Sequence, residues 1–411
     1  MSCDEETAEC LVDRCEDGTS FCDGQEAVVN CIDGAYLPSE PCLNGSRCIA
    51  GRCLSAWETA TLRGDYQGCS FWSIDSDNII NGEGEGPGAS SSAVVLSNVS
   101  MNDCDILIED SEGIVIHQAR LGAGDTEAFS LPRADLIGTH IGGTAWHIST
   151  TQPVLAYQFN PLQRIGTSSV DATLLIPTSA LDDSYRVLTW PGQGYNQRGT
   201  LNIIAVEEGI TTVTIVPQES IAHGIDFRGE LLAIEQRIIA PLSNEPWTET
   251  LARGDVLNVQ SAPFADLSGS LIIADQNLAV FAGTRCSNIP DLTPRCDHLE
   301  HQMLPLRNQG RAYIAPGGLP RASEATWYRA VATVDQTEIT TIPPLPDTPI
   351  TLDAGEVVTI SARAPFSLNA TYPIMLGMFL ASADADAQGT GDPSFVLLPP
   401  VEQFKDHYVF L

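Results

Sequence analysis

Eight of the twelve cysteines in this 411-residue chain lie within its first 53 residues. From the third onward they are separated by spacers of 6, 8, 10, 5 and 4 residues that contain little apolar sequence. Because so short and polar a segment cannot bury a hydrophobic core, cross-links must hold it. We predict a disulfide-rich module over residues 1–55 and an oxidising compartment. The eight residues are Cys3, Cys10, Cys15, Cys22, Cys31, Cys42, Cys48 and Cys53.

The other four cysteines lie in the longer part of the chain. Cys69 and Cys104 flank expected strands, and we favour a bond between them that pins one sheet, with pairing to the N-terminal module as the alternative. Cys286 and Cys296 are expected to bond and close a short loop. Together with His298 and His301 they also have the ligand types of a zinc site, which is the alternative.

The remaining sequence is typical of an all-β protein. Short β-branched segments such as 93–96, 211–216 and 356–360 occur throughout, and long helical periodicity is absent. Turn residues separate these segments roughly every eight to twelve positions, which is the spacing of β-sandwiches or barrels.

Three landmarks recur three times in the same order. They are a glycine followed by an acid (Gly124-Asp125, Gly254-Asp255, Gly355-Glu356), an apolar strand (153–157, 277–281, 373–377), and a proline 8 or 9 residues before a tyrosine (Pro177 and Tyr185, Pro305 and Tyr313, Pro399 and Tyr408). This recurrence predicts tandem β-sandwich modules over residues 56–184, 185–312 and 313–411. The alternative is that the copies pack as one closed, propeller-like body.

The chain is strongly acidic, with 20 Lys and Arg against 53 Asp and Glu and a net charge of −33. Such a charge repels nucleic acid and anionic membrane surfaces, suits cationic partners, and also favours solubility. One acidic loop offers alternating oxygen ligands through Asp75, Asp77, Asn81 and Glu83. We expect a solvated acidic loop and no cofactor, with calcium binding by this loop as the alternative.

Motifs of catalysis are absent from the sequence. There is no G-x-S-x-G, H-E-x-x-H or phosphate-binding loop, and the seven histidines are scattered. No run of 18 apolar residues occurs, so no transmembrane helix is expected. Arg253-Gly254-Asp255 spells the integrin tripeptide, but it lies in the repeated turn, which explains the glycine and the acid without a receptor.

Several segments resemble one known family in the order in which that family has them. Residues 152–160, 168–177, 185–188 and 279–283, followed by Cys286 and the segment 296–305, resemble the N-terminal domain of the IgG-Fc-binding protein family. Residues 68–75 resemble its bacterial members, which often carry a cysteine-rich leader like residues 1–55. The resemblance covers roughly residues 66–411.

The resemblance implies a bacterial, secreted or cell-surface protein that binds or adheres to an extracellular protein or glycan. A vertebrate member is credited with binding immunoglobulin Fc, and the family supplies no catalytic residues. The alternatives are a structural, self-associating surface or fibre subunit, and a secreted enzyme with an unrecognised site. The chain begins Met1-Ser2-Cys3 without a signal peptide, which we expect to have been removed.

The cysteine pattern leads to a direct test. Treatment with a reductant is expected to lower the melting temperature, because the bonds restrict the unfolded chain. Thermal unfolding followed with and without the reductant measures the effect, and an unchanged melting temperature would contradict the prediction.

Overall fold

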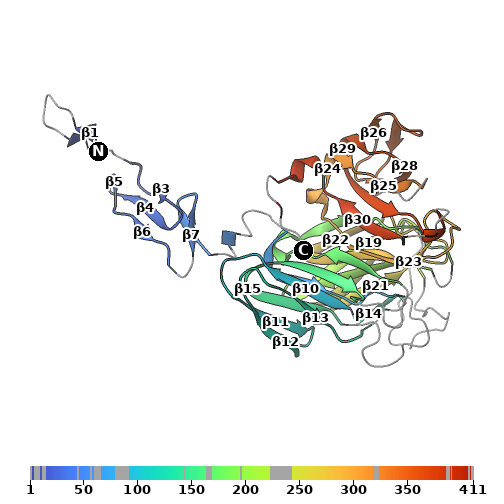
Figure 1. Ribbon diagram of the computed structural model, residues 1–411, viewed down its shortest axis with the longest axis horizontal. Helices are drawn as coiled ribbons and strands as arrows, with labels where there is room; N and C mark the ends of the chain where they lie inside the picture. Colours follow the sequence, from blue (N-terminus) through green and yellow to red (C-terminus); the bar gives the residue numbers. More distant parts are fainter. Residues whose placement is uncertain are drawn as a thin grey trace.

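The computed structural model describes residues 2–3, 10–11, 15–43, 46–55, 58–59, 66–78, 92–134, 136, 138–142, 144–162, 169–194, 197–222, 243–318, 324–385, 389, 391–405 and 408. Over these residues the protein is all-β, as the sequence predicts. A small N-terminal module projects from a larger body of three sheets (Figure 1). None of the described helical segments is long and apolar enough to cross a membrane.

The N-terminal module is a small sheet and a hairpin held by disulfides. Cys15 is bonded to Cys31, Cys22 to Cys48 and Cys42 to Cys53. The last two bonds join the sheet, or the residue that follows its last strand, to the hairpin. Cys3 lies opposite Cys10 in a further two-stranded pair. The strands are β1 (Ser2–Cys3), β2 (Cys10–Leu11), β3 (Ser20–Asp23), β4 (Ala27–Ile32), β5 (Ala35–Tyr36), β6 (Glu40–Pro41), β7 (Arg47–Ile49) and β8 (Arg52–Leu54).

Three larger sheets of seven, eight and seven strands make up the body. The first contains β9 (Gly68–Ser73), β10 (Ala93–Asn98), β11 (Cys104–Asp110), β12 (Val115–Leu121), β13 (Thr126–Ser130), β15 (Trp146–Asn160) and β16 (Asp171–Leu174). The second contains β14 (His140–Ile141), β17 (Asp182–Arg186), β18 (Gly199–Ala205), β19 (Ile210–Val216), β20 (Trp247–Ala252), β21 (Val256–Gln260), β22 (Leu271–Ser287) and β23 (Asp297–Gln302). The third contains β24 (Gly310–Ala315), β25 (Thr326–Ala332), β26 (Thr337–Ile342), β27 (Ile350–Leu352), β28 (Val357–Ala362), β29 (Phe366–Leu380) and β30 (Ser394–Leu398).

Each sheet is organised around one long strand: β15, β22 and β29 have 15, 17 and 15 residues. The first half of β15 pairs with β9 and β11, and its second half pairs with β10 and β16. The same exchange of partners occurs along β22 and along β29. Each long strand therefore passes from one layer of strands to another and gives both layers a common core.

The repeated glycine-acid turn has one geometry in all three sheets. The backbone N–H of Gly124, Gly254 and Gly355 donates to the carbonyl of Asn98, Ala205 and Ala332 respectively, at 2.9, 2.8 and 2.9 Å. The three glycines have φ of 78°, 84° and 89°, a region that side chains other than glycine rarely adopt.

The second of these turns contains the integrin tripeptide. A Cβ on Gly254 would lie 2.8 Å from the Cβ of Ser111, in the turn that follows β11 of the first sheet. The guanidinium of Arg253 lies 5.2 Å from the ring centre of Trp72, and it is paired with Glu208. The tripeptide is thus part of the contact between the first two sheets.

The repeated proline and tyrosine lie where the chain passes from one sheet to the next. The hydroxyl of Tyr185 donates to the Leu278 carbonyl at 2.6 Å and accepts the N–H of Asp182 at 3.1 Å. Tyr313 makes the same pair of bonds with Ile374 and Gly310, at 2.5 and 3.2 Å. Burial raises the pKa of both hydroxyls. Short 3-10 turns precede these tyrosines, and the described turns of this type are η1 (Thr178–Ala180), η3 (Leu306–Asn308), η4 (Ala383–Ala385) and η5 (Val401–Gln403).

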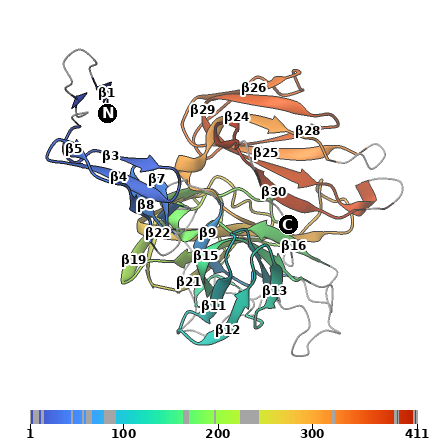
Figure 2. The same ribbon diagram turned by 60° about the vertical axis from the view of Figure 1, so that its left-hand side comes forward.

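Two of the three hydrophobic clusters include residues from a neighbouring sheet, and the third cluster is formed by the third sheet alone. The core of the first sheet includes Ile204 and Phe281 from the second, and the core of the second includes Val331 and Phe379 from the third. In Figure 2 the sheets are packed against one another in a single body. The expected boundaries after residues 184 and 312 fall inside β17 and β24, so the division into three modules stays a prediction.

Replacement of Tyr185 or Tyr313 by Phe is expected to lower the free energy of unfolding by about 1–3 kcal/mol, because a buried N–H and a buried carbonyl each lose a partner. Urea denaturation of the two variants measures the loss. The control is Tyr372→Phe, at a side chain that is 46% exposed, which should change stability little. Equal midpoints for all three variants would contradict the prediction.

Candidate functional site

The last strands of the three sheets, β16, β23 and β30, lie in contact with one another. A dense set of buried polar residues surrounds this meeting point, which we call the junction. Several residues that the sequence marks as candidate ligands lie in or beside it: Asp75, Asp77, Cys286, Cys296 and His298.

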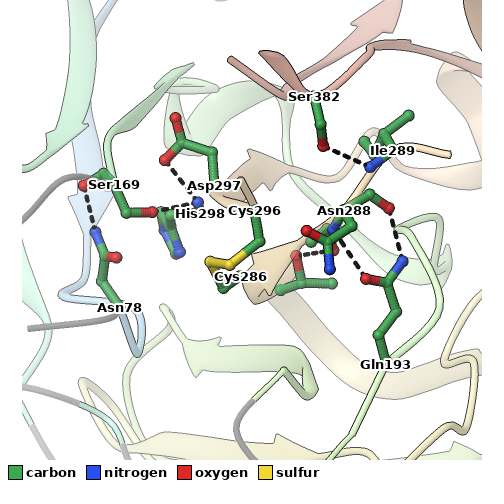
Figure 3. Close-up of a disulfide and its surroundings, with 12 residues drawn as sticks. Asn78, Ser169, Gln193, Cys286, Asn288, Ile289, Cys296, Asp297, His298 and Ser382 are labelled. Carbon is green, nitrogen blue, oxygen red and sulfur yellow. Dashed lines mark hydrogen bonds between the residues drawn. A yellow bond between two sulfur atoms is a disulfide. The ribbon is translucent and has the colours of Figure 1, made fainter. Parts of the chain in front are cut away.

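The cysteine and histidine residues do not assemble a zinc site. Cys286 and Cys296 are bonded to each other, with their Cα atoms 5.2 Å apart, which is the pairing expected from the sequence (Figure 3). Residues three apart in a strand point to opposite faces, so His298 and His301 diverge along β23. No group of three or more His, Cys, Asp or Glu residues suited to a metal occurs in the part of the chain that the structure describes.

His298 is fully buried in the junction. Its Nε2 lies 3.5 Å from a carboxylate oxygen of Glu300, and its backbone N–H donates to Asp297 at 2.9 Å and to the hydroxyl of Ser169 (Figure 3). Burial alone would lower the pKa of His298. The hydrogen bond and charge of Glu300, with the charges of Asp171 and Asp297, outweigh burial and raise it.

Side chains from all three sheets bond to one another at the junction. In the first sheet Gln158 donates to Glu300 at 2.8 Å and accepts the hydroxyl of Ser73 at 2.6 Å. Asp171 accepts the backbone N–H of Glu300 at 3.0 Å and the hydroxyl of Ser394, from the third sheet, at 3.2 Å. These bonds fix the relative position of the three last strands.

Two carboxyl groups at the junction are hard to ionise. Burial raises the pKa of Asp171 to about 8, despite the hydrogen bonds and the His298 charge that favour its ionised form. Burial also raises the pKa of Asp297 to about 6. Proton uptake is therefore favourable in the folded state, which reduces the charge buried between the sheets.

The acidic loop proposed for calcium is only partly described. Asp75 accepts the N–H of Ala134 at 2.8 Å, and Asp77 accepts the side-chain amide of Gln260 at 2.9 Å and is paired with Arg285 at 3.2 Å. Both carboxylates are buried and held by donors of the protein itself. Asn81 and Glu83 lie outside the described residues, so calcium binding by this loop stays a prediction.

The bond favoured between Cys69 and Cys104 is not formed, and both residues are buried free thiols. Cys69 lies on β9 and Cys104 on β11, and these strands pair with opposite edges of β15. Strands separated by a third lie about 9–10 Å apart, beyond the roughly 7 Å between Cα atoms that a disulfide spans. Burial raises the pKa of Cys69 to about 11, so its thiol stays protonated.

A second buried polar centre joins the second and third sheets, and sequence reasoning did not identify it. Arg329 pairs with Asp266 at 2.5 Å, donates to the hydroxyl of Ser268 at 2.9 Å, and lies 5.7 Å from the ring centre of Trp190. A single arginine within a strand has no motif or spacing that could have marked it. Its position between two sheets becomes visible only in three dimensions.

The junction resembles the interior of a protein rather than an open reaction centre. His298 and Glu300 are 0% and 1% exposed, so a substrate cannot reach them in this structure. Their bonds connect strands that belong to different sheets. The fold and the junction together define a disulfide-stabilised all-β protein whose buried polar groups hold its sheets together.

Comparison with known proteins identifies the family. A family model described as IgGFc binding protein matches residues 171–411, from β16 to the end of the chain. The match covers more than half of the chain, and the chain belongs to the IgGFc binding protein family. The resemblance inferred from the sequence is thereby confirmed, although the match begins later than the expected residue 66. No curated protein matches the chain.

Among solved structures, a crystal structure of a β-glucuronidase from Bacteroides uniformis matches the chain weakly. It has 11% sequence identity and a TM-score of 0.12, and the match covers 65% of this chain and 32% of the enzyme chain. The chain thus spans about a third of the enzyme's length. So low a TM-score carries no argument about fold or activity.

His301, on the opposite face of β23 from His298, should make the stability of the protein depend on pH in the acidic range. Burial lowers the pKa of His301 from 6.5 to about 4, opposed by the Gln302 carbonyl and the Glu300 charge. The unfolded chain therefore binds this proton more tightly, and the stability that the neutral ring contributes is present above pH 6.5 and lost as the pH falls towards 4. Between pH 6.5 and 4 the free energy of unfolding of the His301→Gln variant should fall by about 2 kcal/mol less than that of the wild type. This difference is discounted because the ring is partly exposed. Urea denaturation at a series of pH values tests this, and parallel pH profiles would contradict it.

Proposed function

We propose that this protein is a non-enzymatic extracellular or cell-surface binding protein that recognises a protein or glycoprotein partner. The observation that carries this proposal is its membership of the IgGFc binding protein family, matched over residues 171–411. The description of that family refers to a protein partner, the Fc region of immunoglobulin G. Adhesion through such a partner is the role that fits a chain of this kind.

The cysteine chemistry supports a location outside the cytoplasm. Four disulfides are formed among the described residues, and three of them hold the small N-terminal module. A module of this size depends on such bonds, which persist in oxidising compartments.

The surroundings of three histidines support binding rather than catalysis. His298 is enclosed at the junction, His301 lies 5.4 Å from the ring of Phe395, and His147 lies 4.8 Å from the ring of Trp72. Burial lowers the pKa of His147 to about 4, with the charge of Arg253 contributing. Each of these rings is part of the packing of a sheet, and a general base would need access to a substrate proton.

Binding to immobilised Fc fragment in a biosensor tests the proposal. We expect saturable binding of the full chain to Fc, with Fab fragment from the same immunoglobulin as the matched control. The strong negative charge of the chain should make association slower at high salt, because charge steers encounter with basic surfaces. The measurement is therefore made at two salt concentrations.

Equal retention on Fc and Fab would show a non-specific ionic interaction. No retention on Fc would remove Fc as the partner, and a mucin glycoprotein surface, as the second probe, then tests the wider proposal. Absence of binding to both surfaces would contradict the proposed function.

A further inference from the structure

Two large apolar residues in loops of the second sheet are exposed and have an unusual backbone conformation. The side chain of Leu292 is 93% exposed and that of Phe264 is 70% exposed. Both residues have φ of 67°, in the left-handed region that bulky residues rarely adopt. An apolar side chain held in water at the cost of backbone strain contributes nothing evident to the stability of the fold.

The loop that carries Leu292 is held rigidly on several sides. The Cys286–Cys296 disulfide closes it at its base. Next to Leu292, the carboxylate of Asp291 accepts the indole N–H of Trp190 at 2.9 Å. The backbone N–H of Ile289 donates to the hydroxyl of Ser382, from the third sheet, at 2.9 Å (Figure 3). The left-handed conformation of Leu292 is therefore imposed by its surroundings.

The loop that carries Phe264 is attached to the same segment of the chain. Gln193 donates to the Asn288 carbonyl at 2.7 Å and accepts the Asn288 N–H at 2.9 Å, as Figure 3 shows. The neighbouring Gly192 donates its N–H to the Ala265 carbonyl at 3.0 Å. The segment 192–193 thus connects the two loops.

The charges around this surface are unevenly balanced. Arg295 is paired with Asp384 at 3.0 Å, and Asp266 is paired with Arg329. Asp291 accepts hydrogen bonds from neutral donors, and no cation is paired with it among the residues that the structure describes. The surface beside Leu292 is therefore negative, in a chain whose net charge is −33.

We propose that Leu292 and Phe264 form a protein-docking surface, and that the partner protein has an apolar pocket with a basic rim. Rigid loops lose little conformational freedom on binding, so a side chain presented in this way gives affinity efficiently. An apolar anchor surrounded by polar groups is the usual composition of a binding hot spot. The uncompensated Asp291 explains the sign of the partner's charge. The proposal rests on the proposed function only in requiring that the partner be a protein.

The test measures the binding of Leu292→Ala and Phe264→Ala variants to two probes. One probe is Fc fragment, and the other is a set of peptides selected on the wild-type chain from a phage-displayed random library. We expect each substitution to weaken binding about thirtyfold, the effect of removing a hot-spot residue. The selected peptides should combine apolar residues with Lys or Arg. The control is Met101→Ala, at a side chain that is 84% exposed on the first sheet, and it should bind as the wild type does.

The outcomes separate this surface from the proposed function. If Fc binds and neither substitution weakens it, the docking surface is wrong and the proposed function stands. If Fc does not bind but selected peptides lose affinity for the two variants, the surface stands and Fc is not its partner. If the peptides bind all variants equally and Fc binding is absent, the docking surface is overturned.

A further variant tests whether the rigidity of the loop matters. In the Cys286→Ser, Cys296→Ser double variant the loop is no longer closed at its base, so we expect weaker binding through faster dissociation. The melting temperature of this variant is measured in parallel to establish that it is folded. Unchanged affinity in a folded variant would overturn the role assigned to the disulfide.

Discussion

The fold depends on the hydrogen bonding of three long strands, β15, β22 and β29. Each long strand is paired along both edges and changes partners halfway along its length. A strand in this position has almost every backbone donor and acceptor satisfied, so it can run through the interior of the protein. Its two halves commit their partners to different layers, and the layers then enclose one core. The glycine-acid turns and the two tyrosine hydroxyls secure the strands around this arrangement.

The junction determines how the three sheets are oriented relative to one another. Hydrophobic contact between sheets has little directional preference, whereas hydrogen bonds from Gln158 and Ser394 to acidic groups have demanding geometry. Burying Asp171 and Asp297 carries a desolvation cost, which raises the pKa of both carboxyl groups, and the charge of His298 opposes this rise at Asp171. Such groups make packing in one register much more favourable than packing in a shifted one. The junction therefore favours one arrangement of the three sheets over other compact ones.

Local features of the sequence were the most predictable. The all-β class, the cysteine-rich module and the Cys286–Cys296 bond follow from short-range patterns, since the two cysteines are only 10 residues apart. The glycine turns and the prolines before Tyr185 and Tyr313 were recognisable for the same reason. The family could be named because several of these local patterns occur in one order.

Long-range features were not predictable in this way. The Gln158–Glu300 bond joins residues 142 positions apart, and neither local segment indicates that the two side chains meet. The pairing of Cys69 with Cys104 was wrong because both were placed beside strands without knowing that β15 separates them. Arg329 illustrates the same limit, since Asp266 and Ser268 reach it from the second sheet's side. Leu292 has an ordinary sequence context, and only its exposure and backbone conformation distinguish it.

The two free thiols of the first sheet have a consequence for how opening of this protein can be observed. Cys69 and Cys104 are buried on either side of β15, and the raised pKa of Cys69 keeps the reactive thiolate scarce. Alkylating reagents can therefore reach them only when the strands around β15 separate. The chain thus carries a pair of native reporters for local opening of the first sheet.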